Sequence, residues 1–257
     1  MPSHIYVCVK HVPDSAATIT VEGGNAINEN VTFLMNPYDE HAITEAVRIR
    51  ANRNDVEVIA VCLGKTAAQN TLRSAMAMGA DRAILVDTER PLDSILTARG
   101  LAATIRSNGE PWLILTGKEA IDTEGMQTPF RLAANLRMPV ATNVVGLTLC
   151  ADEVQVECEH DPGMVNIIRM TTPCVLGAGK GLNTPIYPTF PDIVKSRRKP
   201  LTRLLLSELT IDSPSSAMVT EHLETATDHR NPERLEGSAD EIASKIVDIL
   251  KNEAKVF

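Results

Sequence analysis

Aromatic side chains, surplus basic residues and long apolar runs are all scarce in this chain of 257 residues. Aromatics make up 3% of it, so aliphatic and methionine side chains must build the core. The formal net charge of −8 argues against a nucleic-acid-binding protein, which needs a basic face. No apolar run approaches the roughly 18 residues of a membrane span, and no signal peptide precedes the first predicted strand. These absences favour a cytoplasmic protein of bacterial or archaeal origin.

Paired cysteines and metal-binding clusters are missing as well. The five cysteines include no Cys-x-x-Cys pair, and their odd number does not suit a closed disulfide framework. Cys8, Cys62 and Cys174 stand in apolar runs of strand length, where a free cysteine packs as a small hydrophobic side chain. The six histidines lack metal-ligand spacing, and no Ser-His-acid or Cys-His grouping is evident. We therefore expect core thiols, no metal and no catalytic nucleophile.

Strand-length apolar runs alternate with helix-period segments in the first half of the chain. Such apolar strands are typical of parallel sheets that are covered on both faces. The alternation predicts an α/β fold with a doubly wound, mainly parallel, Rossmann-like sheet of about five strands. The expected strands are 5–9, 56–61, 83–86 and 112–115; the expected helices begin at Pro37 behind an Asn36 cap, at a capping-box pattern over 66–69, at Leu92 and at Thr128.

The pattern changes after residue 140. Four apolar runs follow without intervening helices, at 144–149, 154–158, 165–170 and 173–176, and they predict an antiparallel extension. From residue 207 the chain becomes polar and acidic, and it supplies −6 of the net charge of −8. Ser238 and Glu241 form a second capping-box pattern at the start of an amphipathic helix. We predict a nucleotide-binding domain over 1–206 and a linker with a helical arm over 207–257.

The segment 113–128 offers the strongest indication of a binding site. An apolar strand runs into a loop with Gly117, which lets the backbone approach a ligand closely, and with the acceptor Asp122. Gln127 and Thr128 follow at a helix start, where free N–H groups and the helix dipole favour a phosphate. In open α/β sheets, ligands bind outside the carboxyl ends of the strands. An ordinary turn capped by Asp122 or Thr123 is the competing interpretation.

Two other segments have simple structural interpretations. Asn36 to Asp39 is explained by a helix N-cap alone, although a cap at the carboxyl edge of a sheet can also contact a ligand. The glycine-rich run 177–181 does not match a phosphate loop, because no Ser or Thr directly follows Lys180, so we interpret it as a turn.

Five segments resemble, in order, the electron transfer flavoprotein beta subunit family, and together they cover roughly residues 4–206. They are Val-Lys-His-Val-Pro-Asp (9–14), Asn-Pro-Tyr-Asp-Glu (36–40), Ala-Met-Gly-Ala-Asp-Arg-Ala (77–83), Gly-Lys-Glu-Ala-Ile-Asp with Gln-Thr (117–128) and Leu-Asn-Thr-Pro-Ile-Tyr-Pro-Thr-Phe-Pro (182–191). The resemblance implies an electron carrier that shares FAD with an alpha subunit and holds AMP. It implies electron donors such as acyl-CoA or similar dehydrogenases, and a membrane-linked quinone oxidoreductase as acceptor.

The same resemblance implies particular binding residues. The implied cofactor-binding positions are Cys8, Asn36, Pro37, Tyr38, Asp39, Leu63, Gly117, Lys118, Glu119, Ala120, Ile121, Asp122, Gly125, Met126, Gln127 and Thr128. The implied partner-binding positions are Pro185, Tyr187, Phe190 and Pro191. Prolines hold that last loop extended, so Phe190 is either tucked into the core or displayed as an anchor.

The match is imperfect at several places and leaves other functions open. The family usually has Glu and Arg where this chain has Thr184 and Ile186, which should change the dehydrogenases accepted, and an Arg where it has Cys158. An electron-bifurcating member would hold a second FAD in place of AMP and oxidise NADH; the Gln127-Thr128 pair favours the AMP type. A stand-alone adenine-nucleotide-binding protein is a third interpretation, from a different functional class.

Overall fold

The computed structural model describes residues 3–53, 55–150, 152–161, 163–212, 215–225 and 234–256. The chain divides into two compact units, Met1–His222 and Leu223–Phe257. The boundary that we predict at residue 206, as a division between domains, stays a prediction.

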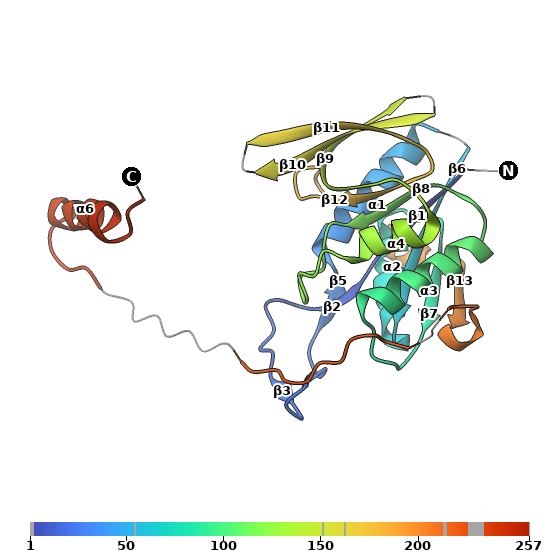
Figure 1. Cartoon of the computed structure of the whole chain (residues 1–257), viewed down its shortest axis with the longest axis horizontal. Helices are drawn as coiled ribbons and strands as arrows, with labels where there is room; N and C mark the ends of the chain where they lie inside the picture. The colour runs from blue at the N-terminus through green and yellow to red at the C-terminus, as the bar shows by residue number, and fades with distance from the viewer. Residues whose placement is uncertain are drawn as a thin grey trace. The chain divides into compact units, whose positions relative to one another are not determined.

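The first unit is built on a nine-stranded sheet, counted over the described residues (Figure 1). Seven adjacent strands are parallel, in the order β9-β12-β8-β1-β6-β7-β13, and β10 and β11 extend the sheet antiparallel beyond β9. The strands are β1 (Ser3–Cys8), β6 (Val56–Gly64), β7 (Arg82–Asp87), β8 (Pro111–Gly117), β9 (Val140–Cys150), β10 (Glu153–Asp161), β11 (Met164–Thr171), β12 (Cys174–Ala178) and β13 (Leu201–Leu205). The predicted α/β class with an antiparallel extension is confirmed.

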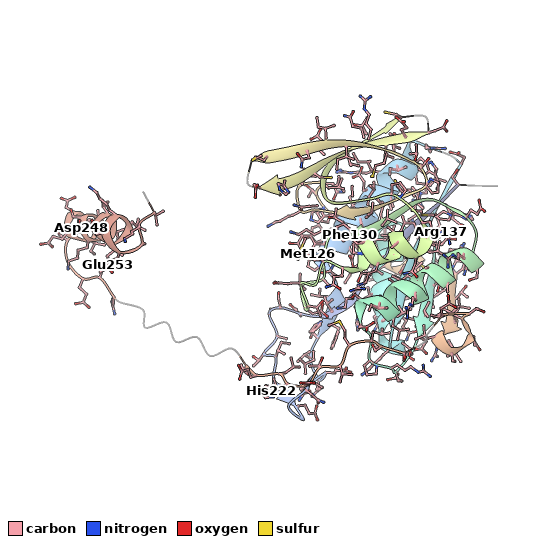
Figure 2. The ribbon with its side chains drawn as sticks, in the orientation of Figure 1. Met126, Phe130, Arg137, His222, Asp248 and Glu253 are labelled. Atoms are coloured by element: carbon pink, nitrogen blue, oxygen red, sulfur yellow. The ribbon has the colours of Figure 1, made fainter. Side chains whose placement is uncertain are left out.

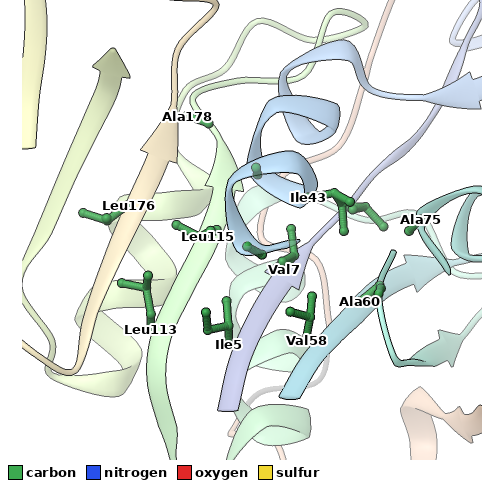
Figure 3. Close-up of a cluster of buried hydrophobic side chains, with 14 of the residues drawn as sticks. Ile5, Val7, Ile43, Val58, Ala60, Ala75, Leu113, Leu115, Leu176 and Ala178 are labelled. Atoms are coloured by element: carbon green, nitrogen blue, oxygen red, sulfur yellow. The ribbon is translucent and has the colours of Figure 1, made fainter. Parts of the chain in front are cut away.

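Helices cover both faces of the parallel strands, as their apolar composition predicts. One hydrophobic cluster packs α1 (Pro37–Ala51) and α2 (Gln69–Met78) on one face, and Figure 3 shows Ile43 of α1 and Ala75 of α2 in one cluster with side chains of β1, β6, β8 and β12. A second cluster packs α3 (Ser94–Ser107) and α4 (Thr128–Leu136) on the opposite face. The free cysteines Cys8, Cys62 and Cys174 are buried in these clusters, which confirms them as core thiols.

Short strands form an excursion between β1 and α1. β2 (His11–Pro13) pairs antiparallel with β5 (Phe33–Met35), and β3 (Val21–Glu22) pairs with β4 (Ala26–Ile27). Gly23 and Gly24 make the turn between β3 and β4 with φ of +63° and +76°, which side chains other than glycine rarely adopt. Residues 21–27 thus form a short hairpin with Gly23 and Gly24 in its turn.

Two predictions about strands are wrong. Residues 173–176 do not belong to the antiparallel extension, because β12 inserts parallel between β8 and β9. The parallel sheet also has more strands than the expected five, because β9, β12 and β13 join it. Strand order depends on pairing between distant segments, so local periodicity does not determine it.

Two predicted caps are also wrong in detail. Thr66 makes no cap bond; a 3₁₀ turn (Thr66–Ala68) precedes α2, and the Thr66 hydroxyl bonds Asp87 instead. Asn36 stands at the N-cap position before Pro37, as predicted, but its side chain does not cap the helix. Buried acceptors and donors elsewhere in the fold compete successfully for these side chains.

The second unit contains α6 (Ala239–Asp248), which continues into a π-helical turn (Ile249–Glu253). The capping box is present: the Ser238 backbone N–H and hydroxyl both contact Glu241 Oε2 at 2.8 Å. None of the residues in this helix is buried within its unit. In the part of the chain that is described, no helix has the length and apolar character to cross a membrane.

Candidate functional site

The order of the strands reverses between β1 and β8. From β1 the chain passes through α1 to β6 and through α2 to β7, each strand farther out on one side, and then returns to place β8 on the other side of β1. Helices leaving β1 and β8 therefore diverge to opposite faces of the sheet. In open α/β folds the crevice at such a point, outside the carboxyl ends of the strands, is the usual ligand site.

The start of α1 and the loop after β8 are joined at this point by two buried polar side chains. Asn36, which is 1% exposed, donates from Nδ2 to the Glu119 carbonyl at 2.8 Å, and its Oδ1 accepts from the Ile121 N–H at 3.1 Å. Asp39, which is 4% exposed, accepts from the Gly117 N–H at 2.8 Å and from the Lys10 N–H at 2.7 Å. Three of these bonds fix the loop after β8 against the start of α1, and the fourth joins α1 to the chain just after β1, so the site is preorganised.

Gly117 is required at this junction for space. A Cβ at this position would lie 2.4 Å from Asp39 Oδ1 and 2.7 Å from Tyr38 Cβ, closer than real Cβ contacts. Gly117 therefore lets the backbone of the loop approach α1 closely, and its close approach to a ligand stays a prediction.

Charged groups surround the junction and are mostly matched. Lys10 Nζ lies 2.7 Å from both Asp122 oxygens, and Lys118 Nζ lies 3.2 Å from Glu119 Oε1 and 5.1 Å from the centre of the Tyr38 ring. Burial raises the pKa of Asp39 to about 7, although N–H groups of Lys10 and Gly117 act in the opposite direction. Lys10 is a contributor that the motif analysis did not single out, since a lysine after a strand carries no local signal of its own.

The start of α4 presents donors that suit a phosphate. The N–H groups of Gly125, Met126 and Gln127 make no hydrogen bond with any described residue, and all three residues are exposed. Gln127, and not Asp122 or Thr123, is the N-cap residue of the helix. Figure 2 labels Met126 and Phe130 at this end of α4. Unpaired N–H groups at a helix start are the donor set that binds anions in proteins, so the residues fit a nucleotide phosphate.

The Gln127 side chain links this helix start to that of α3. Its Oε1 accepts from the Ser94 hydroxyl at 3.2 Å and from Arg131 Nε at 3.0 Å. The N-terminal ends of α3 and α4 therefore lie together at the same edge of the sheet.

The remaining predicted positions divide into core and surface. Cys8 and Leu63 end β1 and β6 at the same edge as Gly117, but their side chains are buried in the core against α3. A ligand could meet their backbone groups only. Ala120 and Thr128 are half-buried, whereas Pro37 and Asp122 are exposed. The cofactor roles of all these residues stay predictions.

The predicted partner loop precedes a short helix, α5 (Phe190–Ser196), on the α1 and α2 side of the sheet. Phe190 is 77% exposed and Tyr187 is 85% exposed, so Phe190 is displayed rather than tucked into the core. Pro185 is half-buried and Pro191 is exposed. A capping box between Thr189 and Asp192 starts the helix at Phe190 and fixes the position of the Phe190 backbone.

Comparison with known proteins identifies relatives along nearly the whole chain. The model of the family described as "Electron transfer flavoprotein domain" matches residues 17–209. The electron transfer flavoprotein subunit beta of Bacillus subtilis is 32% identical over 258 residues, with 99% of this chain and 100% of that protein covered. The mitochondrial beta subunit of Oryza sativa subsp. japonica is 35% identical over 259 residues, at 98% and 99% coverage. The Bos taurus beta subunit is 36% identical over 219 residues, at 83% and 85%.

Proposed function

Because this chain belongs to the electron transfer flavoprotein family, as a beta subunit of an electron carrier, we propose a specific route for its electrons. They come from acyl-CoA or similar dehydrogenases, pass through an FAD shared with the alpha subunit, and leave to a membrane-linked quinone oxidoreductase. AMP is bound by this chain at the junction of β1, β8 and α1.

The junction made by Asn36 and Asp39 is the observation that supports the AMP site most strongly. It lies at the reversal of strand order, and it holds the loop after β8 without using the exposed N–H groups of 125–127. Adenosine would lie against Asn36–Asp39 and the ends of β1 and β6, and the phosphate at the start of α4. A ligand held by a preorganised, rigid site suits a structural role.

This chain's own residues bind and orient, and none is assigned a bond-making step. FAD supplies the redox chemistry when it is bound between the subunits. Lys10 and Lys118 keep the nucleotide side of the junction electrically balanced by pairing with Asp122 and Glu119, while Asp39 holds two backbone N–H groups in place. The amphipathic α6 helix, with no buried face in its unit, packs on the alpha subunit.

Docking to dehydrogenases uses the loop before α5. A single displayed aromatic ring, Phe190, supports a small contact that forms and dissociates quickly. Fast exchange is what an electron carrier needs, because it must leave each donor before it meets its acceptor. Thr184 and Ile186 adjust which donors are accepted.

The deciding experiment measures the nucleotides released by denaturing the protein after co-expression with its alpha partner. One FAD and one AMP per heterodimer are expected. Two FAD and no AMP would replace the carrier proposal with an electron-bifurcating one, and NADH oxidation would then be measured. AMP without flavin, and no stable alpha partner, would favour the stand-alone nucleotide-binding function.

A further inference from the structure

A pocket of about 300 Å³ lies behind the exposed Tyr187, separate from the nucleotide junction. Its walls come from β5, α1, α2 and the loop 185–188. The apolar part includes Phe33, Met78 and Ile186, and the polar part includes Glu40 and Asn70. Its volume stands at the lower end of the range for small-molecule sites, which suits one long side chain better than a cofactor.

Glu40 supplies the pocket with an unmatched charge. It is half-buried, and among the described residues no donor or basic group pairs with its carboxylate. Burial raises the pKa of Glu40 above its ordinary value, since part of its hydration is lost without any compensating partner. The neighbouring His11 does not provide a charge, because burial lowers its pKa and keeps the ring neutral at pH 7. A cation from outside the chain would satisfy this carboxylate.

The pocket walls are held in place before anything binds. On one side the Ile186 N–H donates to the Thr44 hydroxyl at 3.0 Å, and Asn183 Nδ2 bonds Glu45 at 2.9 Å, so the loop is fixed to α1. On the other side Lys199 Nζ bonds the Ala80 carbonyl at 2.7 Å, which fixes the end of α5 to α2. Such preorganisation lowers the entropy that binding must overcome.

The floor of the pocket is fixed too. The His11 ring stacks on Phe33 with centroids 4.8 Å apart, and His11 Nδ1 lies 2.8 Å from the Thr71 hydroxyl. Phe33, held in this way, lines the pocket together with Glu40. Planar guanidinium groups stack on aromatic rings and bind carboxylates with two parallel bonds, and their methylene stems lie along apolar surface.

We propose that this pocket receives an arginine side chain of the dehydrogenase that docks on the Phe190 loop, so that each protein inserts one side chain into the other. The proposal rests on the proposed electron-carrier function for the identity of the partner, but the pocket's preference for a guanidinium does not. The Glu40 carboxylate, which has no partner among the described residues, favours a basic group on that partner. Tyr187 lines the pocket and is exposed, and Phe190 follows it three residues later. We therefore place both contacts on one face of the chain.

The first test uses a small probe and the heterodimer with its alpha subunit. N-acetyl-arginine methylamide is titrated against protein with labelled Ile and Met methyl groups, and the citrulline analogue serves as an uncharged probe of the same shape. The arginine probe should shift the methyl signals of Met78 and Ile186 and bind about tenfold more tightly than the citrulline probe. Equal binding of both probes, or no shift at these methyls, would overturn the proposal.

Three variants locate the effect. Glu40→Gln should remove the preference for arginine, whereas Glu89→Gln, an exposed carboxylate outside the pocket, should retain it. Ile186→Arg should place a cation beside Glu40 from within the chain and block the probe. Melting temperature and nucleotide content show that each variant is folded; a folded Glu40→Gln protein that still prefers arginine would refute the role of Glu40.

The second test measures electron transfer from a purified dehydrogenase. Glu40→Gln should raise the half-saturating concentration about tenfold, with turnover at saturation and AMP content unchanged. An unchanged half-saturating concentration would overturn the docking role. If wild-type protein accepts no electrons from dehydrogenases, the electron-carrier proposal fails, while the probe titration still decides whether the pocket selects a guanidinium.

Discussion

The buried Asp39 carboxyl should make stability depend on pH in an unusual direction. Its two oxygens accept the Lys10 and Gly117 N–H groups, which favours the charged form, but burial is the larger influence and raises the pKa to about 7 from an ordinary 3.8. Replacing Asp39 by Asn keeps the shape and removes the titration. It also turns an NH₂ group toward one of the two backbone N–H groups.

The sign follows from proton counting. Between pH 4 and pH 7 the folded state holds a proton on Asp39 that the unfolded state has lost, so the free energy of unfolding falls as the pH rises. The contribution of Asp39 to the free energy of unfolding is fully present below the pKa of its unfolded state and is lost once the pH passes the pKa of its folded state. A difference of about 3 units at about 1.4 kcal/mol each gives about 4 kcal/mol as an upper limit.

The measurement is the urea midpoint of wild type and Asp39→Asn at several values between pH 4 and pH 8. The stability of wild type relative to the variant should decrease up to about pH 7 and stay level above it. The ¹³C carboxyl resonance of Asp39 should titrate near the same pH. A relative stability that is flat or rises with pH, or a carboxyl that titrates near pH 4, would refute the argument that burial outweighs the two N–H bonds.

Three substitutions test the junction and the docking loop. Asn36→Ala leaves the Glu119 carbonyl and the Ile121 N–H without partners, so it should lower the free energy of urea unfolding by about 1–3 kcal/mol and reduce AMP content. Substitution of the exposed Asn30 by Ala is the control, and equal effects of the two substitutions would contradict the role of Asn36. Gly117→Ala forces a methyl group against Asp39 and should release AMP. A variant that keeps one AMP per chain would show that the junction adjusts to the added methyl group. Phe190→Ala should slow electron transfer from the dehydrogenase about tenfold or more at intact AMP content, and an unchanged rate would remove its docking role.

Local sequence pattern located most helices and the candidate loop. The helix predicted at 128–136 is α4 without any shift, and the helix predicted behind Asn36 begins at Pro37. Pro37 stops any earlier start because it lacks an N–H and fixes φ, and these effects act within one turn of helix. The displayed Phe190 was one of two outcomes that its proline-rich neighbourhood allowed, and its exposure was decided by packing.

Side-chain partners at the junction could not be predicted. The local sequence indicated a helix cap for Asn36 and no polar contact for Lys10. The observed partner of Asn36 is more than 80 residues away in the chain, and that of Lys10 is more than 100 residues away. Asp122 does not cap α4 and bonds Lys10, while its expected role at a ligand stays a prediction. A polar side chain chooses among all donors and acceptors that the fold brings near it, and the sequence shows only those nearby in the chain.

Local patterns in the sequence indicated most of the strands and helices and the loop after β8 as the candidate site, since periodicity, proline and glycine act locally. Tertiary structure alone decided that β12 enters the parallel sheet and that the sheet order reverses beside β1. It also decided that Asp39 is buried and that Glu40, the next residue, lines a pocket and has no partner among the described residues. Burial and charge pairing are properties of the packed chain, because neighbours in space set the loss of hydration and the choice of hydrogen-bond partner.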